Sequence, residues 1–294
     1  MLHDIINAIV QAIIQGLTEF LPVSSSGHLT LYSHLTGAST DEATFMLVIL
    51  HLGTLVAVFI AFWDTILQLI KELGNIIKDI FTGKFTLKDA DTRNPQRNMI
   101  YMLIVSLVLL IPFYPIKSIF EKAGENLIIL GCLFLYTSFI LFTSDRIPKK
   151  KLIKKDGDIT LKDALVIGLF QAGALFPGVS RSGSTICGGL FRGLNRETAV
   201  QYSFILGIPT ILAGCLVELK DALSIGLDIQ PVPVLIGFVV SAIVGILAIK
   251  LVDMLIKSNK FKVFAVYTLV LGLSVITCGV IEQVTGVGIL EYLK

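Results

Sequence analysis

The sequence contains little charge for its length. Only 16% of its 294 residues are Asp, Glu, Lys or Arg, whereas 54% are hydrophobic. A soluble core cannot bury so much apolar surface, so composition excludes an ordinary soluble protein and predicts a polytopic membrane protein. The net charge of +2 is small, and we expect no nucleic-acid partner.

Paired cysteines are also missing, and no removable leader is expected. The four cysteines lie singly in apolar runs, without the spacing of a zinc or redox site. We expect them to pack as small hydrophobic residues. The N-terminus has neither a basic region nor a small-residue cleavage site, so the first apolar segment is expected to stay in the mature protein.

Two polar stretches, residues 15–28 and 171–185, interrupt the apolar sequence and share one pattern. Identical residues at an offset of 156 positions, without a gap, include Gln15 and Gln171, Val23 and Val179, Ser24 and Ser180, Ser26 and Ser182, and Gly27 and Gly183. The chemistry differs at three others: Glu19 and Leu175, Ser25 and Arg181, His28 and Ser184. The sequence therefore predicts a duplicated half, in which one copy contributes acid and base and the other a cation.

Each half begins with a broken apolar segment. Pro22 and the serine–glycine run after it stop the first helix, and Pro177-Gly178 stops its counterpart. The pieces are shorter than the ~20 residues of a span, which predicts two re-entrant hairpins. Three spans are expected to follow each hairpin, at about 43–62, 98–116 and 125–143, and at about 198–217, 233–252 and 263–281.

The basic residues predict the topology. Nineteen of the 24 lie in four loops, at 63–97, 144–162, 192–197 and 250–262, which the positive-inside rule assigns to the cytoplasm. Both termini are then extracytoplasmic, and three spans per half require the halves to be inverted. The broken tips are expected to meet near mid-membrane, as in inverted-repeat transporters.

The predicted fold is an all-α polytopic membrane protein of a single domain, with inverted halves at residues 1–145 and 158–294. Each half has one hairpin and three spans, which gives about six spans and ten helices. An interfacial helix is also expected at 66–80 because the stretch is amphipathic. Thr160 and Asp163 are predicted to form a capping box that starts the second half.

The two tips combine residue types that bind oxyanions. Helix N-termini and glycines offer free N–H groups, and Arg181 is able to clamp a phosphate with two hydrogen bonds. An arginine inside a bilayer needs an anionic partner, either Glu19 or a bound anion. Glu19 is suited to a hard divalent cation. His28 is a candidate acid, base or nucleophile, and Ser25 is the rival nucleophile.

Each of these residues also has a purely structural explanation. Glu19 can be an acid at a helix end, the serines can be helix caps, His28 can bridge a hairpin and Arg181 can snorkel. Their recurrence in register in two copies favours a site. His51 lies in the middle of a span, where we expect a helix-contact hydrogen bond rather than membership of the site.

These stretches resemble the undecaprenyl-pyrophosphate phosphatase family, the integral-membrane type linked to bacitracin resistance. Gln15 to Glu19, followed by Leu-Pro-Val-Ser-Ser-Ser-Gly-His at 21–28, is similar to its first motif. Pro-Gly-Val-Ser-Arg-Ser-Gly-Ser-Thr at 177–185 is similar to its second. The likeness covers essentially the whole chain. Some members have Glu where this chain has Gln15, so a role in metal binding is expected of Glu19 alone.

The resemblance implies removal of the terminal phosphate from undecaprenyl pyrophosphate, which gives the monophosphate lipid carrier for cell-wall synthesis. It implies catalytic roles for Glu19, Ser25, His28 and Arg181, and a divalent metal, Mg²⁺ or Ca²⁺, at Glu19. Seven further residues are expected to bind substrate: Gln15, Ser24, Ser26, Gly27, Ser180, Ser182 and Thr185. The resemblance implies a multi-pass protein of the cell membrane, surrounded by lipids. A homodimer is the oligomeric state left open.

Two other classes of function stay open from the residues themselves. Inverted repeats with meeting hairpins are also typical of transporters and lipid flippases. A transporter needs matching charges but no nucleophile, so the acid, imidazole and hydroxyls opposite one arginine favour chemistry. If the protein were only a structural component of the membrane, the polar residues of the tips would have no function.

Overall fold

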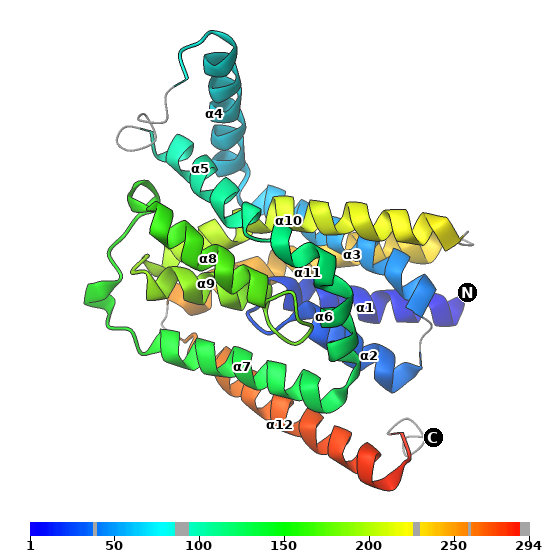
Figure 1. Ribbon diagram of the computed structural model, residues 1–294. Helices are drawn as coiled ribbons and strands as arrows, with labels where there is room; N and C mark the ends of the chain where they lie inside the picture. Colours follow the sequence, from blue (N-terminus) through cyan, green and yellow to red (C-terminus); the bar gives the residue numbers. More distant parts are fainter. Residues whose placement is uncertain (38–39, 86–93, 226–229, 258–259, 289–294) are drawn as a thin grey trace.

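The computed structural model describes residues 1–37, 40–85, 94–225, 230–257 and 260–288. Within these ranges the chain is helical and has no β-strand (Figure 1). The α-helices are α1 (Leu2–Phe20), α2 (Ser25–Thr36), α3 (Thr40–Ala61), α4 (Trp63–Phe81), α5 (Pro95–Val108), α6 (Lys117–Glu125), α7 (Leu127–Asp145), α8 (Leu161–Gly173), α9 (Arg181–Phe191), α10 (Arg196–Ile225), α11 (Pro231–Lys257) and α12 (Lys262–Thr285).

Five of the six expected spans are confirmed as helices that are long and apolar enough to cross a membrane. Five meet both criteria alone: Pro95–Phe113, Leu127–Asp145, Arg196–Lys220, Pro231–Ile256 and Lys262–Thr285. A sixth is met by Phe45–Ala61 together with Trp63–Phe81, which bend by 90° at Phe62. The protein is therefore an all-helical, multi-pass membrane protein.

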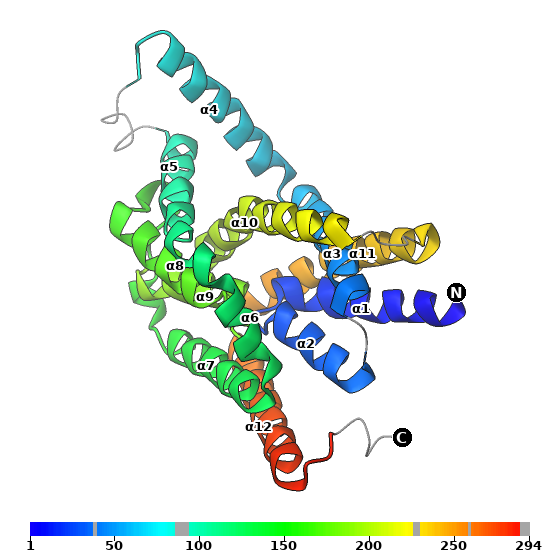
Figure 2. The same cartoon turned by 45° about the vertical axis from the view of Figure 1, so that its right-hand side comes forward.

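The described helices number twelve rather than ten, because α4 and α6 are separate helices. Helix α4 covers the stretch expected to be an interfacial helix, and it projects from the bundle (Figure 2). Arg97 at the start of α5 holds it through Glu72 at 2.5 Å and Asp79 at 2.8 Å. Helix α6 follows a short 3-10 helix, Ile111–Ile116, that contains Pro115. This proline interrupts the regular helix because it lacks a backbone N–H donor.

Both broken segments form helical hairpins, α1 with α2 and α8 with α9. Their open ends lie on opposite sides of the molecule, and their closed ends meet in its middle (Figure 1). The open end of α1–α2 lies on the side of the chain termini, whereas α8–α9 opens toward the other side. The capping box of Thr160 and Asp163 starts α8 as expected. This arrangement positions the two polar tips against each other.

The hairpins are held by close helix packing. Helix α1 packs along α11, where Gly16 lies so close to Val244 that a Cβ at residue 16 would be 2.8 Å from the Val244 Cβ. Helix α7 packs along α12, with Gly131 close to the Gly272 carbonyl. Helix α9 is buried almost throughout. Small residues allow this approach, which van der Waals contacts then stabilise in a membrane.

Candidate active site

The first tip is a short turn between α1 and α2 that ends in a strained serine. Ser24 has a φ of 73°, the one positive φ at a non-glycine position among the residues described. Such a backbone costs roughly 1–3 kcal/mol and persists where surrounding contacts impose it. Here the Ser24 Oγ accepts from the Gly27 N–H at 3.3 Å and from the Gly178 N–H of the other tip at 3.1 Å. Ser24 therefore caps α2 and joins the two hairpins.

The second tip repeats this arrangement with Ser180. Its Oγ accepts from the Gly183 N–H at 3.0 Å and caps α9. Ser182 reaches back across the tips and donates to the Leu21 carbonyl at 3.2 Å. The tips are packed backbone to backbone, because a Cβ at Gly27 would lie 2.8 Å from the Gly178 Cα. The N-termini of α2 and α9 thus lie at one junction.

Glu19 is the centre of the junction. Its side chain is 5% exposed, and its Oε1 accepts from Arg181 Nη2 at 2.5 Å. Its Oε2 accepts from Ser25 Oγ at 2.7 Å and from Gln15 Nε2 at 2.8 Å. The first hairpin supplies the carboxylate, hydroxyl and amide, and the second supplies the cation. A buried carboxylate needs such partners, because removing one leaves an uncompensated charge.

One nitrogen of the Arg181 guanidinium takes no part in the ion pair with Glu19. Its Nη1 is buried and has no hydrogen-bond partner, although Nη2 is bonded to Glu19. Gly207 of α10 makes room for the guanidinium, since a Cβ at residue 207 would overlap Nη1. An unsatisfied buried donor of this kind costs about 1–3 kcal/mol. The unpartnered nitrogen of Arg181 therefore lies against Gly207, on the same guanidinium that binds Glu19.

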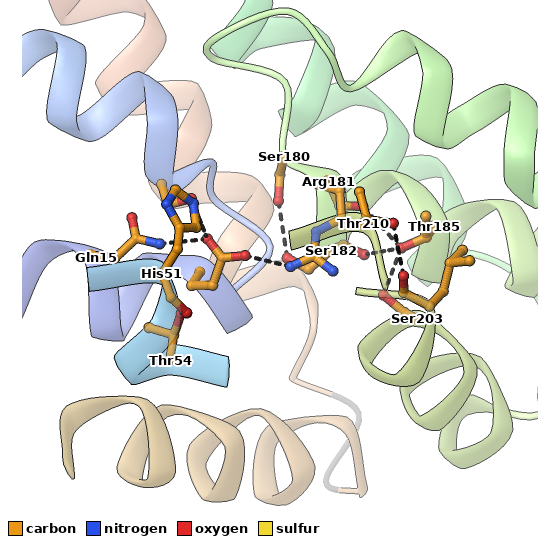
Figure 3. Close-up of polar contacts among 12 residues, drawn as sticks. Gln15, His51, Thr54, Ser180, Arg181, Ser182, Thr185, Ser203 and Thr210 are labelled. Carbon is orange, nitrogen blue, oxygen red and sulfur yellow. Dashed lines mark hydrogen bonds and ion pairs between the residues drawn. The ribbon is translucent and has the colours of Figure 1, made fainter. Parts of the chain in front are cut away.

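Other hydroxyls of the junction support the second tip (Figure 3). Thr137 of α7 donates to the Gly178 carbonyl at 3.0 Å and accepts from the Ser180 N–H at 3.1 Å. Thr185 donates to the Arg181 carbonyl at 2.9 Å and lies 2.6 Å from the Ser203 hydroxyl of α10. Ser26 lies 3.4 Å from Ser24 Oγ. These contacts fix the loops from which a ligand would be held.

His28 is placed apart from Ser25 and Glu19. Its Nδ1 lies 2.7 Å from the Ser24 carbonyl, which can only accept, so this nitrogen carries the proton. Its Nε2 then accepts from the Tyr267 hydroxyl of α12 at 2.7 Å. The His28 ring stacks on Tyr267 and meets Phe134 edge-on. Among the contacts of the described residues, its side chain bonds neither Ser25 nor Glu19.

Three residues at the junction were not foreseen from the sequence. His51 was expected only to make a helix contact, yet its Nε2 lies 3.7 Å from Glu19 Oε2. Its position is equivalent to Gly207 at the offset of 156, so the register of the repeat relates the two residues without marking either as a site residue. Tyr267 carries no signal either, because α12 reaches His28 only through the packing of the fold.

A cavity of about 850 Å³ lies away from the junction, between α3, α4, α10 and α11. Its charged wall includes Lys149, Arg196 and Lys250, and its apolar wall includes Phe62 and Phe204. Phe204 meets Phe62 at 5.9 Å and Phe20 at 5.4 Å between ring centroids. Phe20 follows Glu19 directly in the chain. An aromatic layer of Phe20, Phe62 and Phe204 therefore separates this cavity from the junction.

Comparison with known proteins shows similarity along nearly the whole chain. The family model described as "Bacitracin resistance protein BacA" matches residues 8–274. A protein of Alkaliphilus metalliredigens named undecaprenyl-diphosphatase is 39% identical, over 92% of this chain and 96% of its own. Proteins of the same name from Methanosphaera stadtmanae and Halothermothrix orenii are 39% and 37% identical, over 95% and 93% of this chain and 99% and 97% of their own.

Proposed function

This chain belongs to the BacA family of bacitracin resistance proteins, and on that premise we propose that it is an undecaprenyl-diphosphatase. It removes the terminal phosphate from undecaprenyl pyrophosphate and leaves the monophosphate. The observation that carries this function is the junction of Glu19, Ser25 and Arg181. There a hydroxyl, its proton acceptor and a guanidinium with a free nitrogen come together from two hairpins.

Ser25 is the nucleophile that the geometry favours. Its hydroxyl already donates to Glu19 Oε2 at 2.7 Å, within the reach required of a general base. Ser25 Oγ attacks the terminal phosphorus, its proton passes to Glu19, and the bond to the bridging oxygen breaks to release undecaprenyl phosphate. Glu19 passes this proton to the departing undecaprenyl phosphate. Water then attacks the phosphorus of the phosphoserine and gives a proton to Glu19. The bond to Ser25 Oγ breaks, Ser25 Oγ takes that proton back, and inorganic phosphate leaves. His28, whose Nε2 faces Tyr267, positions the start of α2 in this scheme.

Arg181 and the helix N-termini stabilise the charge that the phosphate carries. The Nη1 of Arg181 has no other partner, and a guanidinium binds phosphate oxygens with directed hydrogen bonds. The α2 and α9 N-termini add free N–H groups and positive ends of helix dipoles. We propose that seven further residues bind substrate, because they form or support these N-termini: Gln15, Ser24, Ser26, Gly27, Ser180, Ser182 and Thr185.

The residues present also fit a divalent metal, Mg²⁺ or Ca²⁺. Glu19 is a hard oxygen ligand, and the buried Gln15 Oε1 beside it has no hydrogen-bond partner. Mg²⁺ commonly binds one or two carboxylates together with substrate phosphates. When bound, such an ion would neutralise pyrophosphate charge; the Ser25 hydroxyl, Glu19 and Arg181 perform the other tasks.

We propose the orientation that the basic residues indicate, with both termini extracytoplasmic and the active site open to that side. The opposed open ends of the two hairpins support an inverted repeat with halves at 1–145 and 158–294. The polyprenyl chain would lie among the spans while its pyrophosphate reaches the tips. A homodimer stays a prediction.

The decisive experiment measures inorganic phosphate released from undecaprenyl pyrophosphate by the detergent-purified protein. The assay is run with Mg²⁺, with Ca²⁺ and with excess chelator. Release that needs a divalent ion and is lost in Ser25→Ala supports the proposal. Trapping of radiolabelled phosphate on Ser25 would identify the nucleophile, and turnover that survives Ser25→Ala would contradict the assigned mechanism. No release under any condition would overturn the function.

A further inference from the structure

His51 approaches Glu19 from the side opposite to Arg181. Figure 3 shows Gln15 and His51 on one side of the junction and Arg181 on the other. His51 lies on α3, and its Nδ1 is 2.9 Å from the Leu47 carbonyl of the preceding turn. Because a carbonyl oxygen only accepts hydrogen bonds, Nδ1 carries the proton. The backbone thus fixes the orientation of the ring and points Nε2 toward Glu19.

When the ring is neutral, its Nε2 presents a lone pair to a carboxylate oxygen. Nε2 lies 3.7 Å from Glu19 Oε2, beyond hydrogen-bond distance. That oxygen already accepts from Gln15 and Ser25, and Oε1 accepts from Arg181. A cation between the neutral ring and the carboxylate would bind both lone pairs. The gap between Nε2 and Oε2 is therefore a place for a positive ion.

The spacing suits a single metal ion. Metal–oxygen and metal–nitrogen bonds are about 2.0–2.2 Å for Mg²⁺ and similar ions. Two ligand atoms of one ion thus lie at most about 4.4 Å apart, and the observed separation is 3.7 Å. Gln15 adds an oxygen, Oε1, that is buried and has no hydrogen-bond partner. An amide oxygen is the kind of ligand that a hard cation accepts.

We propose that His51 Nε2 is a direct ligand of the divalent metal held by Glu19, with Gln15 as the neighbouring oxygen ligand. This rests on the metal of the proposed function and adds a nitrogen ligand to it. It also gives a reason for the difference between equivalent positions: His51 holds a metal ion in the first half, and Gly207 leaves space for the Arg181 guanidinium in the second. Each face of the Glu19 carboxylate then has its own cation.

The test is pulsed electron paramagnetic resonance of Mn²⁺ bound to the full-length protein in detergent, without substrate. A coordinated imidazole gives a ¹⁴N modulation that carboxylate and water ligands do not. We expect this modulation in the wild type and its loss in His51→Gln, with Mn²⁺ affinity at least about tenfold weaker. Gln15→Glu, which adds a carboxylate, is expected to bind Mn²⁺ at least several-fold more tightly.

The matched control is His34→Gln. His34 pairs with Glu282 at 2.9 Å, away from the junction, so this variant should keep both the modulation and the affinity. Mn²⁺ bound without ¹⁴N modulation, or a modulation that survives His51→Gln and disappears in His28→Gln, would overturn the proposal. So would a wild type that binds no Mn²⁺. Phosphate release is a separate readout: its absence alongside intact ¹⁴N modulation would overturn the phosphatase and leave the ligand assignment standing.

Discussion

The two hairpins use the same backbone for opposite chemistry. In each, a serine caps the second helix by accepting from the N–H three residues later, at Ser24 and Ser180. The side chains around these caps differ, because Glu19 is present in one tip and Leu175 in the other. Gln15 consequently donates to a carboxylate, whereas its counterpart Gln171 is buried with both amide atoms unpartnered.

This difference shows which features belong to the scaffold and which to the reaction. The turn, the serine cap and the close backbone approach occur in both hairpins, so they build the junction. The acid, the nucleophile and the cation each occur once, so neither hairpin is a site alone. The second hairpin has no carboxylate for the Gln171 amide to bind, and an unsatisfied buried amide destabilises the fold. Four pairs of substitutions would break or sharpen this comparison.

The largest effect is expected from Glu19→Gln. The amide keeps the size of the side chain but cannot take the Ser25 proton, and it no longer neutralises Arg181. General-base catalysis contributes about 10²–10⁴-fold, so we expect kcat to fall at least about 10³-fold. Leu175→Met, at the equivalent position, should stay near the wild type. The measurement is phosphate release by both variants. Comparable losses of activity would refute the asymmetry of the tips.

Gly207→Ala should have the second-largest effect. A Cβ at this position would overlap the Arg181 guanidinium, and a displacement of about 1 Å at a reacting group can cost 10²-fold. We expect kcat/KM to fall about 10²-fold with the fold intact. Gly214→Ala is the control on the same helix, because nothing lies within 4 Å of its Cβ position. Equal kinetics for the two variants would show that Arg181 is not confined at Gly207.

Substitutions of the two equivalent glutamines should have different effects, a gain of stability at Gln171 and a loss of activity at Gln15. Gln171→Met removes an unsatisfied amide and keeps similar volume, so we expect the free energy of unfolding to rise by about 1–2 kcal/mol with activity unchanged. Gln15→Met removes a donor to Glu19 and should lower activity. Unfolding of both variants in detergent, alongside phosphate release, tests this. Destabilisation by Gln171→Met would mean that its amide is satisfied in the membrane.

The smallest effect concerns the open end of the second hairpin. Asp163 lies outside the spans and is buried, and burial raises the pKa of its carboxyl group. Lys154, Thr160 and Arg192 donate hydrogen bonds to the carboxylate, and together they hold this pKa below its usual range. A lowered folded pKa gives stability that is present above the unfolded value, about 3.9. That stability is lost as pH falls through the folded pKa.

The measurement is the pH dependence of unfolding below about pH 5. Asp163→Asn should flatten the curve in this acid range. Asp64→Asn is the control in the first half, because Asp64 is exposed in the first turn of α4. An unchanged curve in Asp163→Asn would show that this ion cluster does not stabilise the fold.

The sequence predicted the helices and the meeting of the tips because these follow from local signals. Pro22 and Pro177-Gly178 break helices wherever they occur, and Arg181 in an apolar segment requires an anionic partner. It did not predict the contact of His28 with Tyr267, because that contact joins residues far apart in the chain and depends on how α12 packs. The choice between Ser25 and His28 stayed open for the same reason: both lie on α2, and only the tertiary structure shows which one meets Glu19.

The aromatic layer of Phe20, Phe62 and Phe204 has an electrical consequence. The cavity beside it is lined by charged residues of both signs, among them Lys149, Arg196, Lys250, Glu197 and Asp253. A polar cavity of this kind carries the potential of its own side of the membrane inward, so the transmembrane voltage falls over a shorter distance near the tips. One elementary charge moved through 100 mV exchanges about 2.3 kcal/mol. Glu19 and Arg181 hold each other in place as an ion pair, so these two charges do not move through the field at rest. The step that feels the field is the arrival of the anionic headgroup.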